Sequence, residues 1–332
     1  MKAIVRLGAI LAAVCIVGTS GGTAANAQTA VRIGVSSSGS VFYTLGVGLS
    51  AMLGKYAKIS ANAEPVGGST ANMFALGADK VDLAIANAGA SYDAFHGNKP
   101  FKRKIGVRLI AQGAPNLRQI VVRVGSGIEK PEDLAGKTII GKRPALPELG
   151  KITDALLKVY KIDPSKVKIV STTNTGEAVK AIQSGTVDAV VIPGSAGAGY
   201  LRRLMREKKI RYLKIPADKM KAIVALLPKY VSAAKLPANT YENQPNAIEV
   251  FGLASYLVAA ARVSDDTVYQ VTKTLFDHIG EFHGFHAAAK EWTLQEALEP
   301  PTVPYHPGAI KYFKEKGVWT PALAKLQAEL KP

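Results

Sequence analysis

Three short polar segments, each directly after a strand-like run, hold residue types that suit the binding of an anion. They are 36–40 (Ser-Ser-Ser-Gly-Ser), 67–69 (Gly-Gly-Ser) and 87–89 (Asn-Ala-Gly). Two of them precede stretches with helical spacing, and the free N–H groups at a helix N-terminus attract a carboxylate. Glycine allows close backbone approach, and hydroxyls add donors. Ordinary capped turns are the alternative. The predicted contacts are Ser36, Ser38, Ser40, Tyr43, Gly68, Ser69 and Asn87.

A second group of candidate residues follows two later strand-like runs. Lys142 and Arg143 come after the run 138–140, and an arginine can hold a carboxylate through two parallel hydrogen bonds. A charged pair at the surface is the alternative. The segment 193–199, after the run 187–192, contains mostly small residues and predicts a flexible stretch with little side-chain chemistry. The predicted contacts of this group are Lys142, Arg143, Pro193 and Ser195.

Motifs for catalysis or metal binding are weak in this sequence. The G-x-S-x-G motif of serine hydrolases occurs only at 18–22, within the first 27 residues that have the pattern of a leader, and is missing from the rest of the chain. The triplet 136–138 (Gly-Lys-Thr) resembles the end of a phosphate-binding loop, but Pro131 stands where the first glycine belongs. The spacing of His278, His283 and His286 fits no standard zinc pattern, so we expect surface or packing roles for them. The sequence predicts no catalytic residue, metal or cofactor, and the chain is not expected to be an enzyme.

The periodicity of apolar residues predicts α/β elements that would position these segments. Strands are expected at 31–35, 61–66, 81–86, 119–124, 138–140, 167–170, 187–192 and 250–258. Helical segments are expected at 41–56, 70–77 with Ser69 as N-cap, 128–137, 152–160, 175–184 ending at Gly185, and 265–278. Strands alternating with helices are typical of a mostly parallel sheet.

Two sets of these units predict two lobes. We expect lobe 1 to combine residues 28–118 with about 245–332, and lobe 2 to span about 119–244. The chain would then cross between the lobes twice, through two hinge strands. The cleft between them would be the place for a ligand.

The first residues predict a secretory signal peptide with cleavage after Ala27. Lys2 and Arg6 precede an apolar run that extends from 7 to 17. A cleavage site of small residues ends at Ala27. Cleavage removes Cys15, the only cysteine, so the mature chain would have no disulfide and would lie in the periplasm.

Length and composition limit the remaining possibilities. With 332 residues, 48% of them hydrophobic, the chain is long enough for two folded lobes. The net charge of +17, reduced to +15 without the leader, could indicate a nucleic-acid partner. The basic residues are scattered and lack the interleaved aromatic platform of single-strand binders. We therefore expect no nucleic-acid partner.

Five short stretches, in order along residues 31–318, resemble the solute-binding proteins of tripartite ATP-independent periplasmic (TRAP) transporters, in the TAXI family. They are Gly39–Gly46, Gly67–Asn72, Val81–Asn87 with 92–97, Gly185–Ala189 and His306–Ala309. The turn Gly141–Glu148 departs from the family pattern, and Asn87-Ala88 replaces a Gln-Ser-like pair.

This resemblance implies a two-lobed type II periplasmic binding protein fold, with a mostly parallel sheet in each lobe. It implies a monomeric receptor that closes on a small organic anion, a carboxylate or an amino-acid-like solute. The solute would then pass to TRAP membrane permease subunits, driven by an ion gradient. A receptor of the same fold for an ATP-driven importer or a sensor is the alternative, followed by a secreted hydrolase.

Overall fold

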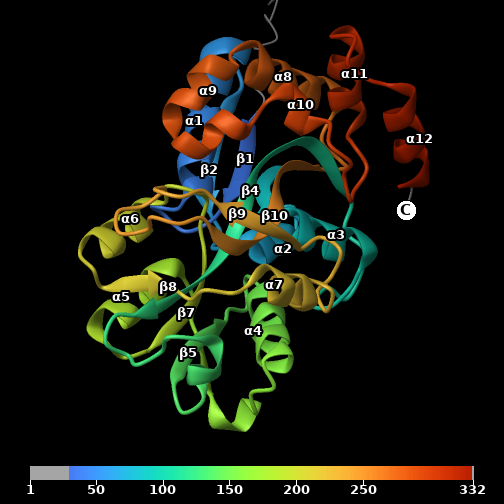
Figure 1. Cartoon of the computed structure of the whole chain (residues 1–332). Coiled ribbons are helices and arrows are strands. Elements are labelled where there is room, and N and C mark those ends of the chain that lie inside the picture. Colours follow the sequence, from blue (N-terminus) through green and yellow to red (C-terminus); the bar gives the residue numbers. More distant parts are fainter. Residues whose placement is uncertain (1–29, 331–332) are drawn as a thin grey trace, which may run out of the picture.

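The computed structural model describes residues 30–330 (Figure 1). The predicted signal peptide and Cys15 lie outside the described residues. Within 30–330, no helix has the length and apolar character needed to cross a membrane.

Ten strands of the described chain form one continuous sheet in the order β2-β1-β3-β10-β4-β7-β5-β6, with β8 beside β4 and β9 beside β10. The strands that precede residue 130 are β1 (Ala30–Val35), β2 (Ser60–Pro65), β3 (Leu83–Asn87) and β4 (Val107–Arg123). The later strands are β5 (Thr138–Lys142), β6 (Lys168–Ser171), β7 (Ala189–Pro193), β8 (Ile210–Tyr212), β9 (Ser232–Leu236) and β10 (Ile248–Ala260).

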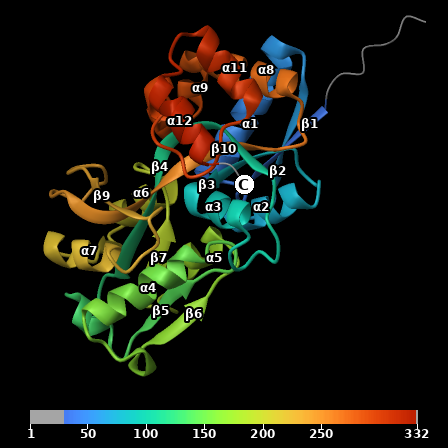
Figure 2. The ribbon, with the colours of Figure 1, turned by 90° about the vertical axis from the view of Figure 1, so that its right-hand side faces the viewer.

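Strands β4 and β10 are long enough to belong to both halves of the molecule. They pair antiparallel to each other along most of their length, with register shifts between Leu253 and Ser255 and between Leu257 and Val258. At one end they join the parallel group β2-β1-β3, and at the other the parallel group β7-β5-β6. Figure 2 shows both strands running from one half of the molecule to the other. These are the two crossings that the sequence predicts.

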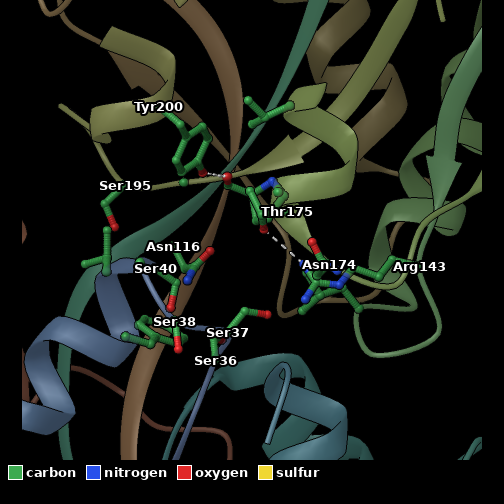
Figure 3. A pocket seen from close by; sticks show the side chains of 18 of the residues that line it. Ser36, Ser37, Ser38, Ser40, Asn116, Arg143, Asn174, Thr175, Ser195 and Tyr200 are labelled. Carbon is green, nitrogen blue, oxygen red and sulfur yellow. Dashed lines mark hydrogen bonds between the residues drawn. The ribbon is translucent and has the colours of Figure 1, made fainter. Parts of the chain in front are cut away.

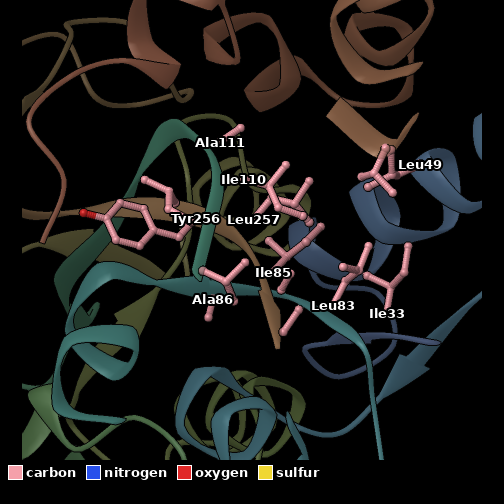
Figure 4. Close-up of a cluster of buried hydrophobic side chains, with 14 of the residues drawn as sticks. Ile33, Leu49, Leu83, Ile85, Ala86, Ile110, Ala111, Tyr256 and Leu257 are labelled. Carbon is pink, nitrogen blue, oxygen red and sulfur yellow. The ribbon is translucent and has the colours of Figure 1, made fainter. Parts of the chain in front are cut away.

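Buried apolar side chains form separate cores on either side of these crossings. The first core takes its members from residues 31–111 and 256–313, including Ile33, Leu83 and Leu257 (Figure 4). Two further clusters, on opposite faces of the other half of the sheet, take theirs from 117–253. We name the halves that surround these cores lobe 1 and lobe 2. The exact lobe boundaries stay a prediction.

Helices cover the sheet in both lobes. Lobe 1 contains α1 (Val41–Met52), α2 (Ser69–Gly77), α3 (Ala88–His96), α8 (Asp265–Asp277), α9 (Ile279–Phe285), α10 (Leu294–Ala297), α11 (Pro307–Glu315) and α12 (Pro321–Glu329). Lobe 2 contains α4 (Glu148–Val159), α5 (Thr175–Ser184), α6 (Gly199–Arg206) and α7 (Ala217–Val224). Helices α4 and α7 pack on one face of the lobe 2 sheet, and α5 and α6 on the other.

The predicted elements agree with this architecture in most places and differ in three. The helical segment expected at 128–137 is limited to a 3-10 turn at Pro131–Leu134. Helix α5 has the predicted bounds and ends at Gly185 with φ of +81°. The strand expected at 119–124 is only the last part of β4, which begins at Val107. The elements α6, β8, α7 and β9 were not expected.

Candidate ligand-binding site

A cavity of about 340 Å³ lies between the two lobes. Lobe 1 contributes residues 36–42 and Ser69, the crossing strand β4 contributes Asn116 and Arg118, and lobe 2 supplies the remaining wall. Figure 3 shows the serines of one wall facing Arg143, Asn174 and Thr175 of the other. A volume of this size suits a small organic molecule.

The lobe 1 wall is the turn between β1 and α1. Ser40 is the N-cap of α1, and its hydroxyl accepts a hydrogen bond from the Tyr43 N–H at 3.2 Å. The first two N–H groups of the helix, at Val41 and Phe42, have no acceptor in the described part of the chain, and both residues line the cavity. The positive end of the α1 dipole therefore faces the cavity.

The opposite wall contains a second helix N-terminus. Asn174 caps α5, and its side-chain oxygen accepts a hydrogen bond from the Glu177 N–H at 2.9 Å. Thr175 and Gly176, the first residues of this helix, line the cavity. Two helix N-termini from different lobes thus meet one cavity, an arrangement that favours an anion.

Arg143 lies in the same wall and is 5% exposed. Its guanidinium donates to the carbonyl of Gly67 in lobe 1 at 2.5 Å and to the Thr175 hydroxyl at 3.1 Å. Its Nε is buried without a partner. Within residues 30–330 no carboxylate lies within 4 Å of it, and burial and then the charge of Arg118 lower its pKa. Arg143 is a buried cation that lacks a counter-charge.

The backbone of β5 explains why Arg143 and its neighbour point in different directions. In an extended strand successive side chains point to opposite faces of the sheet. Lys142, the last residue of β5, is exposed and does not line the cavity, contrary to the prediction for it, while Arg143 is buried.

Arg118 differs from Arg143 because it has a full set of partners. It is 1% exposed, and its Nε and Nη2 contact Oε1 of Glu148 at 2.9 and 2.5 Å. It also donates to Asn116 Oδ1 and to the Leu117 carbonyl. This pair was not predicted, although an arginine inside an apolar strand requires a buried partner.

Three other predicted contacts stand outside the cavity lining. Asn87 caps α3 through its Oδ1 and donates from Nδ2 to Glu148 Oε1 at 3.1 Å, so it joins the lobes behind the cavity. Gly68 lies against Ala145 of lobe 2, where the Thr70 N–H donates to the Ala145 carbonyl at 3.2 Å. Tyr43 packs partly against the lobe 1 core.

Ser69 lines the cavity as predicted, but it does not cap α2. The helix begins at Ser69, with Gly68 in the N-cap position and no side-chain cap. The Ser69 hydroxyl instead accepts a hydrogen bond from the Asn87 N–H at 3.0 Å. This bond links two of the predicted polar segments, 67–69 and 87–89.

The segment after β7 is ordered by its neighbours and is not the featureless stretch that its small residues predict. Ser195 is 4% exposed and, with Pro193, lines the cavity as predicted. The Tyr200 hydroxyl donates to the Pro193 carbonyl, and the Ala198 N–H donates to the Tyr241 hydroxyl at 3.1 Å. This segment begins α6, which adds Tyr200 and Arg203 to the wall.

Contacts between the lobes at the rim show that they are closed upon each other. The Tyr230 hydroxyl accepts from Lys151 Nζ on α4 at 2.8 Å and donates to Asp93 Oδ2 on α3 at 3.1 Å. Together with the Arg143–Gly67 and Asn87–Glu148 contacts, these bonds join the two lobes around the cavity.

The histidine cluster has packing roles in the structure. His278 stacks on Tyr56 with ring centroids 3.5 Å apart, and His283 Nε2 lies 3.0 Å from the Trp292 carbonyl oxygen. Among residues 30–330, no group of three or more His, Cys, Asp or Glu side chains is arranged to hold a metal ion.

The chain matches a protein family and has a fold similar to that of several solved structures. A model of the NMT1-like family matches residues 33–317. MatC from Rhodopseudomonas palustris, solved with bound malate, is 12% identical over 92% of this chain and all of its own, with a TM-score of 0.56. A protein from Bordetella bronchiseptica RB50 is 16% identical over 90% of this chain and 92% of its own, with a TM-score of 0.52. These matches confirm the predicted two-lobed α/β fold.

The periplasmic aliphatic sulphonate binding protein SsuA from Escherichia coli is also similar. It is 15% identical over 90% of this chain and 91% of its own, with a TM-score of 0.45. MatC was solved with bound malate, and SsuA is named as an aliphatic sulphonate binding protein.

Proposed function

We propose that this chain, which belongs to the NMT1-like family, is an extracytoplasmic receptor that binds a small organic anion between its lobes. The observation that carries the proposal is Arg143. A buried guanidinium without an ion-pair partner among the described residues is costly, because its charge has lost water and has no carboxylate within 4 Å. An anion in the adjoining cavity supplies the missing charge.

The surroundings of Arg143 support an anion with several acceptor atoms. The N-termini of α1 and α5 add free N–H groups and partial positive charge from both lobes. Hydroxyl groups provide further donors around the same cavity. The proposed ligand contacts are Ser36, Ser38, Ser40, Ser69, Asn116, Arg143, Thr175, Pro193, Ser195 and Tyr200.

Binding and lobe closure are coupled in this proposal. Arg143 belongs to lobe 2 but donates to the Gly67 carbonyl of lobe 1, beside the cavity. An anion held by both helix N-termini adds contacts that exist only when the lobes are together, and so it shifts the population toward the closed form. The bending would occur in β4 and β10, the two crossings between the lobes.

We also propose that the ligand is delivered to a membrane transporter. The five motif stretches that resemble the TAXI family support delivery to the permease subunits of a TRAP transporter. The leader-like residues 1–27 support export to the periplasm and removal of the leader. Uptake of the labelled ligand by cells that make the chain should then stop when ionophores dissipate the ion gradients. Uptake that persists under ionophores and stops on ATP depletion would assign the chain to an ATP-driven importer.

A thermal-shift screen of protein beginning at Gln28 tests the receptor function. A library of carboxylates, sulfonates and amino acids should contain compounds that raise Tm, because a ligand that binds only the folded state stabilises it. The Arg143→Gln variant should lose the shift, whereas Arg206→Gln, which changes an exposed arginine of α6 outside the cavity, should keep it. If no compound in the library stabilises the protein, the small-anion receptor is excluded.

A further inference from the structure

The described residues that line the cavity include positively charged side chains and no negatively charged ones. Four of its lining residues are cationic, namely Arg118, Arg143, Lys180 and Arg203, and among its described lining residues none is Asp or Glu. An amino acid carries an ammonium group beside its carboxylate, and an ammonium has three donors and no acceptor. A site that holds an amino acid therefore needs acceptor atoms as well as donors.

Two acidic residues of lobe 2, Glu148 and Glu177, already accept hydrogen bonds from the protein. Glu148 Oε1 receives hydrogen bonds from both Arg118 and Asn87. The Glu177 carboxylate is exposed and receives the Thr173 N–H and hydroxyl and the Asn174 side-chain amide, at 2.6–3.1 Å. Neither carboxylate lines the cavity.

The neutral acceptors of the wall are occupied as well. The carbonyl of Pro193 accepts from Tyr200, that of Gly194 from Gln119, and that of Ser195 from Tyr241. Asn116 Oδ1 accepts from Arg118, and Asn174 Oδ1 accepts from the Glu177 N–H. The Gly67 carbonyl beside the cavity accepts from Arg143. The serine hydroxyls and the backbone carbonyls of Ser36, Ser38 and Gly39 remain as acceptors, and all of these are neutral groups.

We infer that the ligand is an organic anion without an ammonium group, a carboxylate or sulfonate whose polar atoms are acceptors only. This inference rests on the proposed function and narrows its ligand class by excluding amino acids. An ammonium here would lose its water, meet no carboxylate and lie among guanidinium groups, and juxtaposed like charges oppose binding.

Matched pairs of compounds test the inference at pH 7.5, by titration calorimetry on protein beginning at Gln28. Each pair differs in the ammonium group alone: glutarate and glutamate, succinate and aspartate, propionate and alanine, ethanesulfonate and taurine. In every pair that binds, the member without the ammonium should bind about tenfold tighter or more. Equal or tighter binding of the amino member would overturn the inference and leave the receptor function intact. No binding in any pair or in the wider library would overturn both.

A variant of one serine adds a second readout. Ser38 lines the cavity, is exposed, and makes no side-chain hydrogen bond in the described chain, so its replacement should leave folding unchanged. Ser38→Asp should weaken the ammonium-free member and move the preference within a pair toward the amino member. Ser38→Asn, which has the same shape without the charge, should keep the wild-type preference. The same shift in both variants would show that charge does not set the preference, against the inference.

Discussion

Two buried arginines line the same cavity, but the regions that hold them differ in kind. Arg118, on the crossing strand β4, has Glu148 as its ion-pair partner and further acceptors from Asn116 and Leu117. Arg143, at the end of β5, has one carbonyl and one hydroxyl as acceptors and an unpartnered Nε. The charge of Arg118 is balanced by groups of the protein itself, whereas the charge of Arg143 is balanced only when an anion binds beside it.

This difference separates a structural charge from a binding charge. A buried ion pair whose partners are both hydrogen-bonded is balanced in the ligand-free protein, and removing one partner leaves the other uncompensated. A buried cation without a counter-charge is already uncompensated, so its removal affects the ligand more than the fold. Variants of Arg118 and Arg143 therefore test whether one arginine contributes mainly to stability and the other mainly to ligand affinity.

Breaking the Arg118–Glu148 pair should have the largest effect. Arg118→Ala leaves the Glu148 carboxylate buried and unpaired, and we expect the free energy of unfolding to fall by about 3–5 kcal/mol. Urea denaturation of the ligand-free protein gives this value. The double variant Arg118→Met with Glu148→Leu, which leaves no charge, should recover most of the loss. A loss below about 1 kcal/mol in the single variant would remove the distinction between the two regions.

Arg143→Ala should show the opposite pattern. The affinity for a ligand found in the screen should fall by about 1.5–3 kcal/mol, the scale of a hydrogen bond to a charged group. The free energy of unfolding without ligand should change by about 1 kcal/mol or less, because two hydrogen bonds are lost while a desolvated charge is removed. Calorimetry and urea denaturation give the two values. Arg206→Ala is the control, and an unchanged dissociation constant for Arg143→Ala would exclude Arg143 from the site.

An ion-pair cluster at the edge of lobe 1 gives the smallest effect and tests the role of burial. Asp82 contacts Arg32 at 3.0 Å and Arg262 at 2.8 Å. Burial alone would raise its pKa, but the hydrogen bonds from these arginines outweigh burial and lower the pKa from 3.8 to about 2. The stabilisation from this lowered pKa is therefore present above pH 3.8 and disappears as the pH falls toward 2.

The measurement compares wild type with Asp82→Asn by urea denaturation between pH 7 and pH 2.5. We expect a difference of about 0.2–1 kcal/mol at pH 7, because solvent screens a partly exposed pair, and the difference should shrink below pH 3.8. Asp154→Asn, at an exposed position of α4 without an ion pair among residues 30–330, is the control. A difference that grows on acidification would contradict the assignment.

The two walls of the cavity also differ in how well the sequence predicts them. The lobe 1 wall is a strand–turn–helix unit, 31–45, whose serines and helix start are adjacent in the chain. Local patterning placed Ser36, Ser38 and Ser40 at the end of β1, and all three line the cavity. The lobe 2 wall combines the starts of α5 and α6 with the end of β5, which are brought together only by tertiary packing.

Particular residues show why the remainder could not be predicted. Strand β4 begins at Val107, but Gly113, Pro115 and Asn116 interrupt its apolar pattern, so only its last part was recognised. Lys142 and Arg143 are adjacent cations at the end of β5, and strand alternation places only one of them in the cavity, which the sequence pattern did not decide. Asn87 follows a strand as the prediction required, yet its amide turns to Glu148, 61 positions later in the chain.

The order of the two cores along the chain has a consequence for folding. The clusters of lobe 2 use one continuous stretch, 117–253, whereas the lobe 1 core joins 31–111 to 256–313. During synthesis, the set of core residues of lobe 2 is completed before that of lobe 1. Strand β3 can pair with β10 only after β10 has been made. Closing that long-range pairing is entropically slow. Lobe 1 can therefore be completed only after residues 256–313 are made, which come later in the chain than the last core residue of lobe 2.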